Sequence, residues 1–126
     1  MTRRFSLEIV GPDSGNYNAC VVELRIVERP DRLSAVITFV LDSDPPFSLP
    51  HFVVLTAEHE GTTTNHGRAQ ILQLAGIAGI DRGSISSPDD LQFLVGTRVR
   101  VAIRARERDG IQVPEIASIL GPAAEG

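Results

Sequence analysis

Arginines gather in one late segment of the chain, and their spacing is the feature of the sequence best suited to chemistry. Five of the twelve arginines lie between residues 98 and 108: Arg98, Arg100, Arg104, Arg106 and Arg108. With Glu107 as its single acid, the segment has a net charge of +4, whereas the seven arginines and 15 acids elsewhere give −8. Side chains at alternate positions of a β-strand point to the same side about every 6.5–7 Å. Phosphates along a single nucleic-acid strand have a similar spacing, so a row of guanidinium groups could bind such a backbone.

The same arginines also fit a solvated strand face. Asp109-Gly110 is a strong signal for a two-residue hairpin turn, and such a turn pairs residues whose numbers sum to 219. Arg104 then faces Glu115, which would neutralise one member of the row. Two interpretations therefore stay open: a track for a polyanion, and a charged face balanced by its acidic neighbours.

Aromatic side chains matter because base stacking contributes about 1–3 kcal/mol per base to single-strand binding. The chain has no tryptophan, one tyrosine and five phenylalanines. Phe39 and Phe93 stand in apolar contexts that predict the core. Tyr17, Phe47 and Phe52 are the three candidates for exposure, and Phe47 is the best placed because it follows Pro45-Pro46. Each of the three also fits a packing role.

No motif in the sequence predicts catalysis, a metal or a cofactor. Lysine is absent, and we find no HExxH, GxSxG or phosphate-binding GxxxxGK pattern. The three histidines, with Glu58 and Glu60, do not share metal-ligand spacing on a predicted helix or strand. Cys20 lies on an apolar strand pattern and is expected to be a small buried side chain. We therefore predict that the protein is not an enzyme.

The composition describes one ordinary domain. The chain has 126 residues, 42% of them hydrophobic, and its isoelectric point of about 5.3 argues against adhesion of the whole surface to polyanions. A single cysteine excludes an intramolecular disulfide and favours a reducing compartment. The sequence contains neither an apolar run of membrane-spanning length nor a recognisable signal peptide. We expect a cytoplasmic protein without membrane contact.

The strands that would position the arginines are predicted from apolar alternation. They cover residues 5–9, 17–27, 33–41 and 52–57, followed by the hairpin on either side of Asp109-Gly110. In the 17–27 strand, one face is expected to hold Cys20, Val22, Leu24 and Ile26. In the hairpin, Ile116 and Leu120 are expected to join the core opposite Ile103 and Val99, and Pro114 indicates an edge strand or a bulge.

Helices are predicted between the third and fourth of the strands counted from Tyr17. Thr64 or Asn65 can cap a helix that ends at Gly79. Ser87-Pro88 begins a second, short helix that ends before Gly96, with Leu91, Phe93, Leu94 and Val95 directed inward.

This order is that of the OB-fold, a five-stranded, partly open barrel with a helix between strands three and four. We predict one mainly β, OB-like domain over residues 1–126, with an N-terminal strand and loop at 1–15, the barrel at 16–121 and a tail at 122–126. A different small α+β sandwich fits the same order.

Several short stretches resemble a family of small phage and prophage proteins. They are Ser14-Gly15-Asn16-Tyr17, Gly67-Arg68-Ala69-Gln70-Ile71-Leu72, Ala78-Gly79-Ile80, Asp89-Asp90-Leu91, Leu94-Val95-Gly96, Val99 to Ile103, Asp109-Gly110 and Pro114-Glu115-Ile116. Members often look like OB-fold single-stranded-DNA-binding proteins from recombination modules. The resemblance implies an OB-like fold, with Arg68 and the arginines of 98–108 as binding residues. Asparagine is usual in the family where Pro114 or Glu115 stands, and lysines on its basic strands are arginines here.

The leading hypothesis is a nonspecific accessory protein that binds single-stranded DNA or RNA and acts with a phage-type recombinase or nuclease. Its expected contacts are the five arginines of 98–108 with Arg25, Arg68, Tyr17 and Phe47. The alternative is a protein-interaction or assembly module that associates with itself and has no nucleic-acid role.

Overall fold

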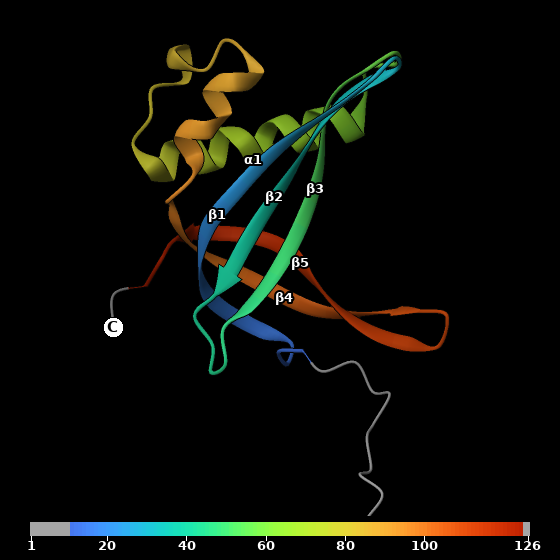
Figure 1. The fold of residues 1–126 in the computed structure, drawn as a ribbon, viewed down its shortest axis with the longest axis vertical. Coiled ribbons are helices and arrows are strands. Elements are labelled where there is room, and N and C mark those ends of the chain that lie inside the picture. Colours follow the sequence, from blue (N-terminus) through green and yellow to red (C-terminus); the bar gives the residue numbers. More distant parts are fainter. Residues whose placement is uncertain (1–10, 125–126) are drawn as a thin grey trace, which may run out of the picture.

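The fold is built on one antiparallel sheet of five strands (Figure 1). The computed structural model describes residues 11–124. Its elements are β1 (Gly15–Arg29), β2 (Arg32–Leu41), β3 (Phe47–Ala57), α1 (Thr62–Ala78), the 3₁₀ helices η1 (Arg82–Ser84) and η2 (Pro88–Leu94), β4 (Arg98–Arg108) and β5 (Ile111–Pro122). A mainly β chain with helix between the third and fourth strands is therefore confirmed. The strand predicted at 5–9 lies outside the described residues.

The sheet is strongly curved but does not close. The strand order is β3-β2-β1-β4-β5, so β3 and β5 are its two edges. Pro114 is on edge strand β5, as predicted, and Pro50 is on edge strand β3. Neither proline has an amide hydrogen to offer across the gap. The gap between the two edges is the setting of the candidate site described below.

A bulge in β1 changes which side chains face the core. The register with β2 shifts between Val21 and Glu23, so one extra residue stands in β1. Ala19 and Val21 are buried before the bulge and Leu24 after it. The prediction that Cys20 and Val22 share the buried face was therefore wrong, because Val22 is 46% exposed and Cys20 is only partly buried.

The β4–β5 hairpin forms as predicted near its turn. Asp109 and Gly110 both have positive φ, at 52° and 79°, and Arg104 faces Glu115. Further along, two register shifts place Val99 opposite Pro122. The predicted core position of Leu120 was therefore wrong, since its side chain is 47% exposed and its neighbour Ile119 is buried.

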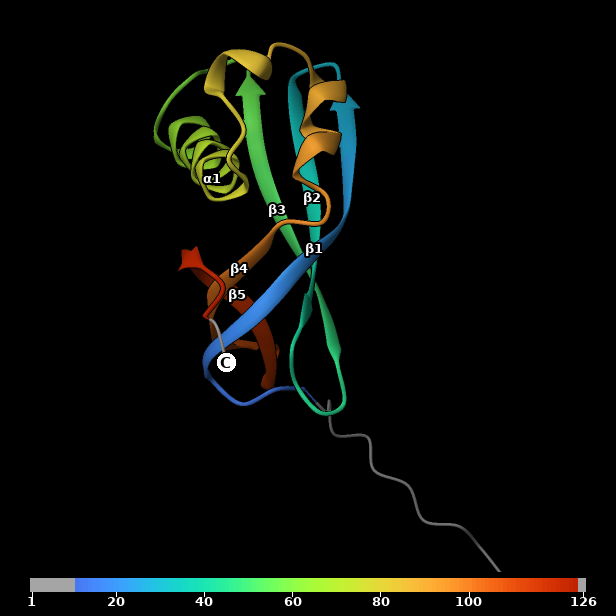
Figure 2. The ribbon, with the colours of Figure 1, turned by 90° about the vertical axis from the view of Figure 1, so that its left-hand side faces the viewer.

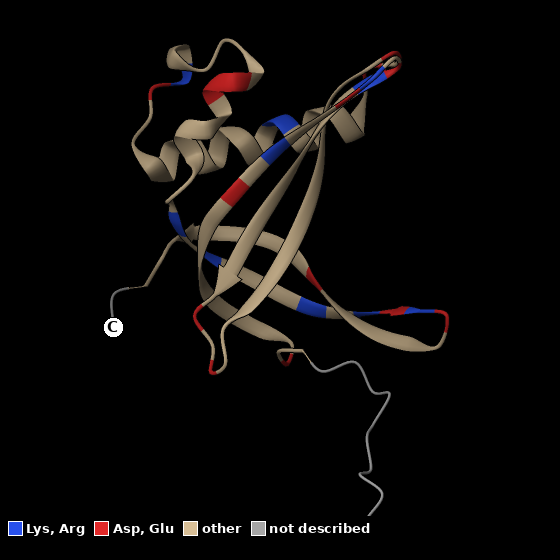
Figure 3. Cartoon of the chain, in the orientation of Figure 1, with Lys and Arg blue, Asp and Glu red and all other residues tan. Residues whose placement is uncertain are grey.

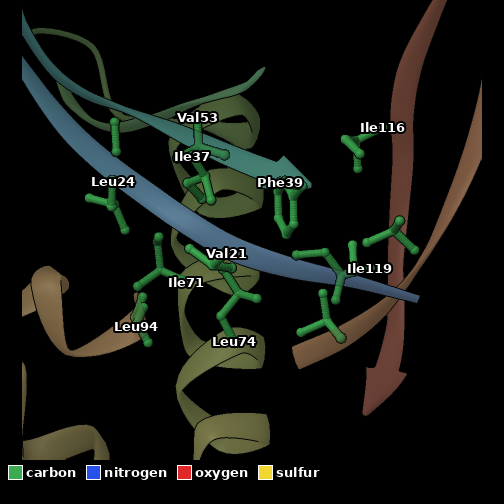
Figure 4. Close-up of a cluster of buried hydrophobic side chains, with 14 of the residues drawn as sticks. Val21, Leu24, Ile37, Phe39, Val53, Ile71, Leu74, Leu94, Ile116 and Ile119 are labelled. Carbon is green, nitrogen blue, oxygen red and sulfur yellow. The ribbon is translucent and has the colours of Figure 1, made fainter. Parts of the chain in front are cut away.

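The core fills the concave side of the sheet, and α1 and η2 cover one end of it (Figure 2). Figure 4 shows Ile37, Phe39 and Val21 of the sheet in one cluster with Leu74 of α1 and Leu94 of η2. All five side chains are fully buried, as the sequence predicted for Phe39.

The helix α1 lies directly on β3. Gly67 permits this contact, because a Cβ atom at that position would overlap the carbonyl oxygen of Val54. The backbones of the helix and the strand therefore touch without an intervening side chain.

The helix ends were only partly predictable. Gly61, and neither Thr64 nor Asn65, is the N-cap of α1, while the Thr64 hydroxyl accepts from the Gly61 N–H at 3.0 Å and donates to its carbonyl at 2.9 Å. Gly79 ends α1 in the left-handed region, as predicted, with φ 74°.

Ser87 precedes η2 as predicted, and the Asp90 carboxylate accepts the backbone N–H groups of Ser86 and Ser87. These hydrogen bonds lower the pKa of Asp90. Phe93 and Val95 were wrongly predicted to point inward: they are 59% and 40% exposed. A 3₁₀ helix repeats every three residues, so only Leu91 and Leu94 align on its buried side.

Candidate nucleic-acid interface

A groove of about 590 Å³ lies between the edge of β3 and the β4–β5 hairpin. Its walls are β3 on one side and the hairpin on the other, and α1 contributes His66 and Gln70. Three of the predicted arginines line it: Arg104, Arg106 and Arg108. The curvature of the sheet thus brings part of the β4–β5 hairpin next to β3, a strand that is distant from it in sequence (Figure 1).

Glu115 is the acid that faces these arginines. Its carboxylate lies 3.0 Å from Nε of Arg104 and 3.7 Å from Nη1 of Arg106. The arginine side chains remain 64% and 60% exposed, against 24% for Glu115. Within residues 11–124, Arg108 has no ion pair. One carboxylate cannot neutralise three guanidinium groups, so the groove lining keeps a net charge of +2 with most arginine donors open to solvent.

The other two arginines of the row lie away from the groove. Arg98 is exposed at the start of β4, opposite Cys20, and Nη1 of Arg100 donates to Oδ1 of Asn18 at 3.1 Å. In Figure 3 the arginines appear as blue segments that recur along β4, and acidic residues appear in red near the hairpin tip. The row predicted as one continuous stripe is divided between two regions of the surface.

Arg68 is held by its own surroundings. Its Nε donates to the Leu55 carbonyl at 2.6 Å, and its Nη2 lies 2.7 Å from Oε1 of Glu60. The hydrogen bond from Arg68 lowers the pKa of Glu60. The residue lies in a hollow beside η2 and does not line the groove, so the structure does not bring it together with the hairpin arginines.

Of the aromatic candidates, Phe52 has the most accessible ring. Tyr17 is partly buried and its hydroxyl donates to the Asp13 carbonyl at 2.7 Å. Phe47 touches the groove but is partly buried against the core. Phe52 is 51% exposed, and the guanidinium carbon of Arg32 lies 5.9 Å from the centre of its ring.

Arg25 belongs to the same face of the sheet as Phe52. It is exposed on β1 and pairs with Val36 of β2, which in turn pairs with Phe52 of β3. Directly paired residues of adjacent strands have Cβ atoms about 5 Å apart. The Cβ atoms of Arg25 and Phe52 are separated by two such steps, because Val36 lies between them. Arg25 does not line the groove.

The sequence interpretation missed Arg32, which lies against the ring of Phe52, and Gln70, which joins two histidines in the groove. It treated the histidines only as metal ligands. Phe47 was predicted to be the best placed of the aromatic candidates, but Phe52 is the more exposed; the available signal was alternation along β3, in which Phe52 precedes buried Val53. In the described part of the chain, no three histidine, cysteine or acidic side chains lie close enough together to hold a metal ion.

Three polar side chains form a hydrogen-bonded chain in the groove. Oε1 of Gln70 lies 2.7 Å from Nε2 of His51, and Nε2 of Gln70 lies 3.2 Å from Nε2 of His66. Burial lowers the pKa of His51, and its hydrogen bond with Gln70 opposes that effect.

We expect the stability of the protein to fall as the pH decreases from about 7.5 to 5.5, because His51 is less basic in the folded chain than the usual value of about 6.5 in an unfolded one. Below that value the unfolded chain binds a proton that the folded chain resists. His51→Gln should flatten the dependence, measured as the free energy of unfolding in urea at each pH. His59→Gln, outside the groove, is the control; an equal flattening there would contradict the assignment.

A larger hollow of about 970 Å³ lies near the β1–β2 turn. Its charged lining consists of four acids and two arginines, namely Glu28, Asp31, Glu58, Asp89, Arg29 and Arg32. Its net negative charge makes it unsuited to a polyanion.

No protein-family model matches this chain, and a search of curated proteins finds no match. No helix in residues 11–124 has the length and apolar character needed to cross a membrane.

Proposed function

We propose that this chain is a nonspecific single-stranded nucleic-acid-binding protein with an OB-like barrel. The observation that carries the proposal is the groove in which three exposed arginines face a single carboxylate, with the exposed ring of Phe52 on its rim. Guanidinium groups bind phosphate oxygens through paired hydrogen bonds, and an exposed aromatic ring can stack on any base.

The OB-like barrel is supported by the arrangement of the two sheet edges. In the order β3-β2-β1-β4-β5, pairing of β3 with β5 would close the sheet into a five-stranded barrel. Both edge strands border the same groove, so the sheet has curled far enough to bring them opposite each other. The gap between β3 and β5 would give a single strand of nucleic acid access to side chains of both edge strands.

The role as an accessory to a phage-type recombinase or nuclease follows from the family resemblance. A protein that coats single strands without sequence preference fits such a role, because its binding depends on backbone charge and stacking. The acidic remainder of the surface would keep contacts with nucleic acid confined to the groove side.

The direct test is fluorescence anisotropy with a labelled single-stranded oligonucleotide of mixed sequence. We expect micromolar binding at low salt that weakens steeply with salt, because each contacted phosphate releases counterions. Unlabelled single strands of different sequence should compete about equally, and duplex DNA should compete less well. Absence of an anisotropy change at micromolar protein and low salt would eliminate the proposal.

Phe52→Ala is expected to weaken oligonucleotide binding about tenfold, since a stacked base contributes roughly 1–3 kcal/mol. Its ring is half exposed, so the loss should come from binding and not from folding. Phe93→Ala removes another exposed ring, away from the groove, and should leave the affinity unchanged. Equal affinities of wild type and Phe52→Ala in the anisotropy titration would show that the ring does not contact the strand.

The alternative function, a self-associating assembly module, is favoured by a separate apolar surface. Val22, Phe93 and Val95 are all substantially exposed, and the Gly96 N–H donates to the Val21 carbonyl at 2.7 Å, which brings the segment after η2 against β1. Exposed apolar clusters mark contact surfaces in soluble proteins. Light scattering after size exclusion tests this function: a strict monomer at high concentration contradicts it.

A further inference from the structure

The chain His51–Gln70–His66 lies in the groove next to the arginines and has no part in the phosphate contacts described so far. We propose that it is a proton-coupled phosphate subsite, in which a bound polyanion causes the histidine pair to take up one proton and no more than one. This inference rests on the proposed function, because the polyanion is the ligand of the same groove.

The limit of one proton follows from the chemistry of the amide between the two rings. An amide group has one accepting end, its oxygen, and one donating end, its NH₂. The oxygen of Gln70 faces Nε2 of His51 at 2.7 Å, and its nitrogen faces Nε2 of His66 at 3.2 Å. His51 therefore donates through Nε2, and His66 accepts.

Rotation of the amide by half a turn only exchanges the two roles. In either orientation, one Nε2 atom carries hydrogen and the other presents a lone pair. The donating ring can take an extra proton on Nδ1 without disturbing the chain. A proton on the second ring would place two donors face to face across the amide, which leaves a buried polar group unpaired. The His66 ring is exposed on α1 and can turn to solvent when protonated, but Gln70 is 7% exposed, so its NH₂ group would be left without a partner.

The charges around the pair explain why a phosphate would change its protonation. The charged and polar groups that line the groove with His51 are Gln70 and His66 of α1, Glu115 of β5, and Arg104, Arg106 and Arg108 of β4; the ring of Phe39 on β2 is 6.3 Å away. In the free protein, burial disfavours the imidazolium form of His51 and so lowers its pKa, while Glu115 favours that form. A bound phosphate adds negative charge beside the ring and thus favours proton uptake.

The test is oligonucleotide affinity between about pH 8 and pH 5.5 at constant ionic strength, a range in which ordinary carboxylates stay ionised. We expect affinity to rise as the pH falls, by no more than tenfold per pH unit, since one proton is taken up. The double variant His51→Gln/His66→Gln should lose this dependence. Each single variant should keep part of it, because the remaining imidazole can take the proton.

His59→Gln is the matched control, since His59 is the third histidine of the chain and lines a different hollow. It should retain the wild-type pH dependence. A dependence that survives in the double variant, or one that approaches a hundredfold per pH unit, overturns the proposal.

Proton NMR titration of the histidine rings without oligonucleotide separates this proposal from the proposed function. We expect protonation of one groove histidine to shift protonation of the other to lower pH. In Gln70→Glu, the carboxylate can accept from both rings, so both should protonate together. Independent titration in the wild type overturns the subsite even if the oligonucleotide binds. Coupled titration with no oligonucleotide binding at any pH overturns only the nucleic-acid function.

Discussion

Replacement of Arg104, Arg106 and Arg108 together by glutamine is expected to lower the affinity for single-stranded DNA by about a hundredfold or more at about 50 mM salt. Each phosphate contact to a single strand contributes about 0.7 to the slope of log affinity against log salt, so three lost contacts should also reduce that slope by about 2. Anisotropy titrations at several salt concentrations measure both quantities. The loss of affinity and the decrease in the salt slope should correspond to the same number of lost phosphate contacts, because both arise from the released counterions.

The control is a triple variant with the same change in net charge, made at exposed arginines outside the groove. Arg29, Arg82 and Arg98 meet this requirement. If the control loses as much affinity as the groove variant, then the charge of the whole protein and not the groove decides binding. Both variants should unfold close to the wild-type temperature, because surface substitutions usually change stability by less than about 0.5 kcal/mol.

Gly67→Ala is expected to destabilise the fold by about 3 kcal/mol, the upper part of the usual range for overpacking. The new methyl group would overlap the carbonyl oxygen of Val54, and backbone cannot turn aside as a flexible side chain can. To fit it, α1 must move away from β3, which would separate buried contacts such as those of Ile71 and Leu74. Urea unfolding followed by circular dichroism measures the loss.

Gly76→Ala is the matched control, since Gly76 is in the same helix and a Cβ there meets nothing within 4 Å. It should raise stability by about 0.5–1 kcal/mol, because alanine restricts the unfolded chain and favours helix. Equal stability of Gly67→Ala and wild type would mean that the helix is not seated on β3 in this way.

What could be predicted from the sequence depended on short-range chemistry. The turn at Asp109-Gly110 requires positive φ at neighbouring positions, and the residues themselves supply it, so the pairing of Arg104 with Glu115 was correct. Gly79 was predictable as a helix end for the same reason. The edge position of Pro114 followed from its missing amide hydrogen.

What could not be predicted depended on register. A bulge in β1 and two register shifts in the hairpin reversed the expected burial of Val22 and Leu120, and alternation alone contains no sign of an inserted residue. The candidate site also depends on tertiary curvature. The alternation of arginines predicted their common face, but only the curl of the sheet selects which three of them meet β3 and α1.

The two edge prolines have a consequence for solubility. A free strand edge normally exposes a ladder of amide donors and carbonyl acceptors, and other molecules can add strands to it until fibrils or precipitates form. Pro50 and Pro114 each interrupt that ladder on one of the two free edges. Each free edge therefore offers one amide donor fewer to an added strand, which should disfavour templated aggregation.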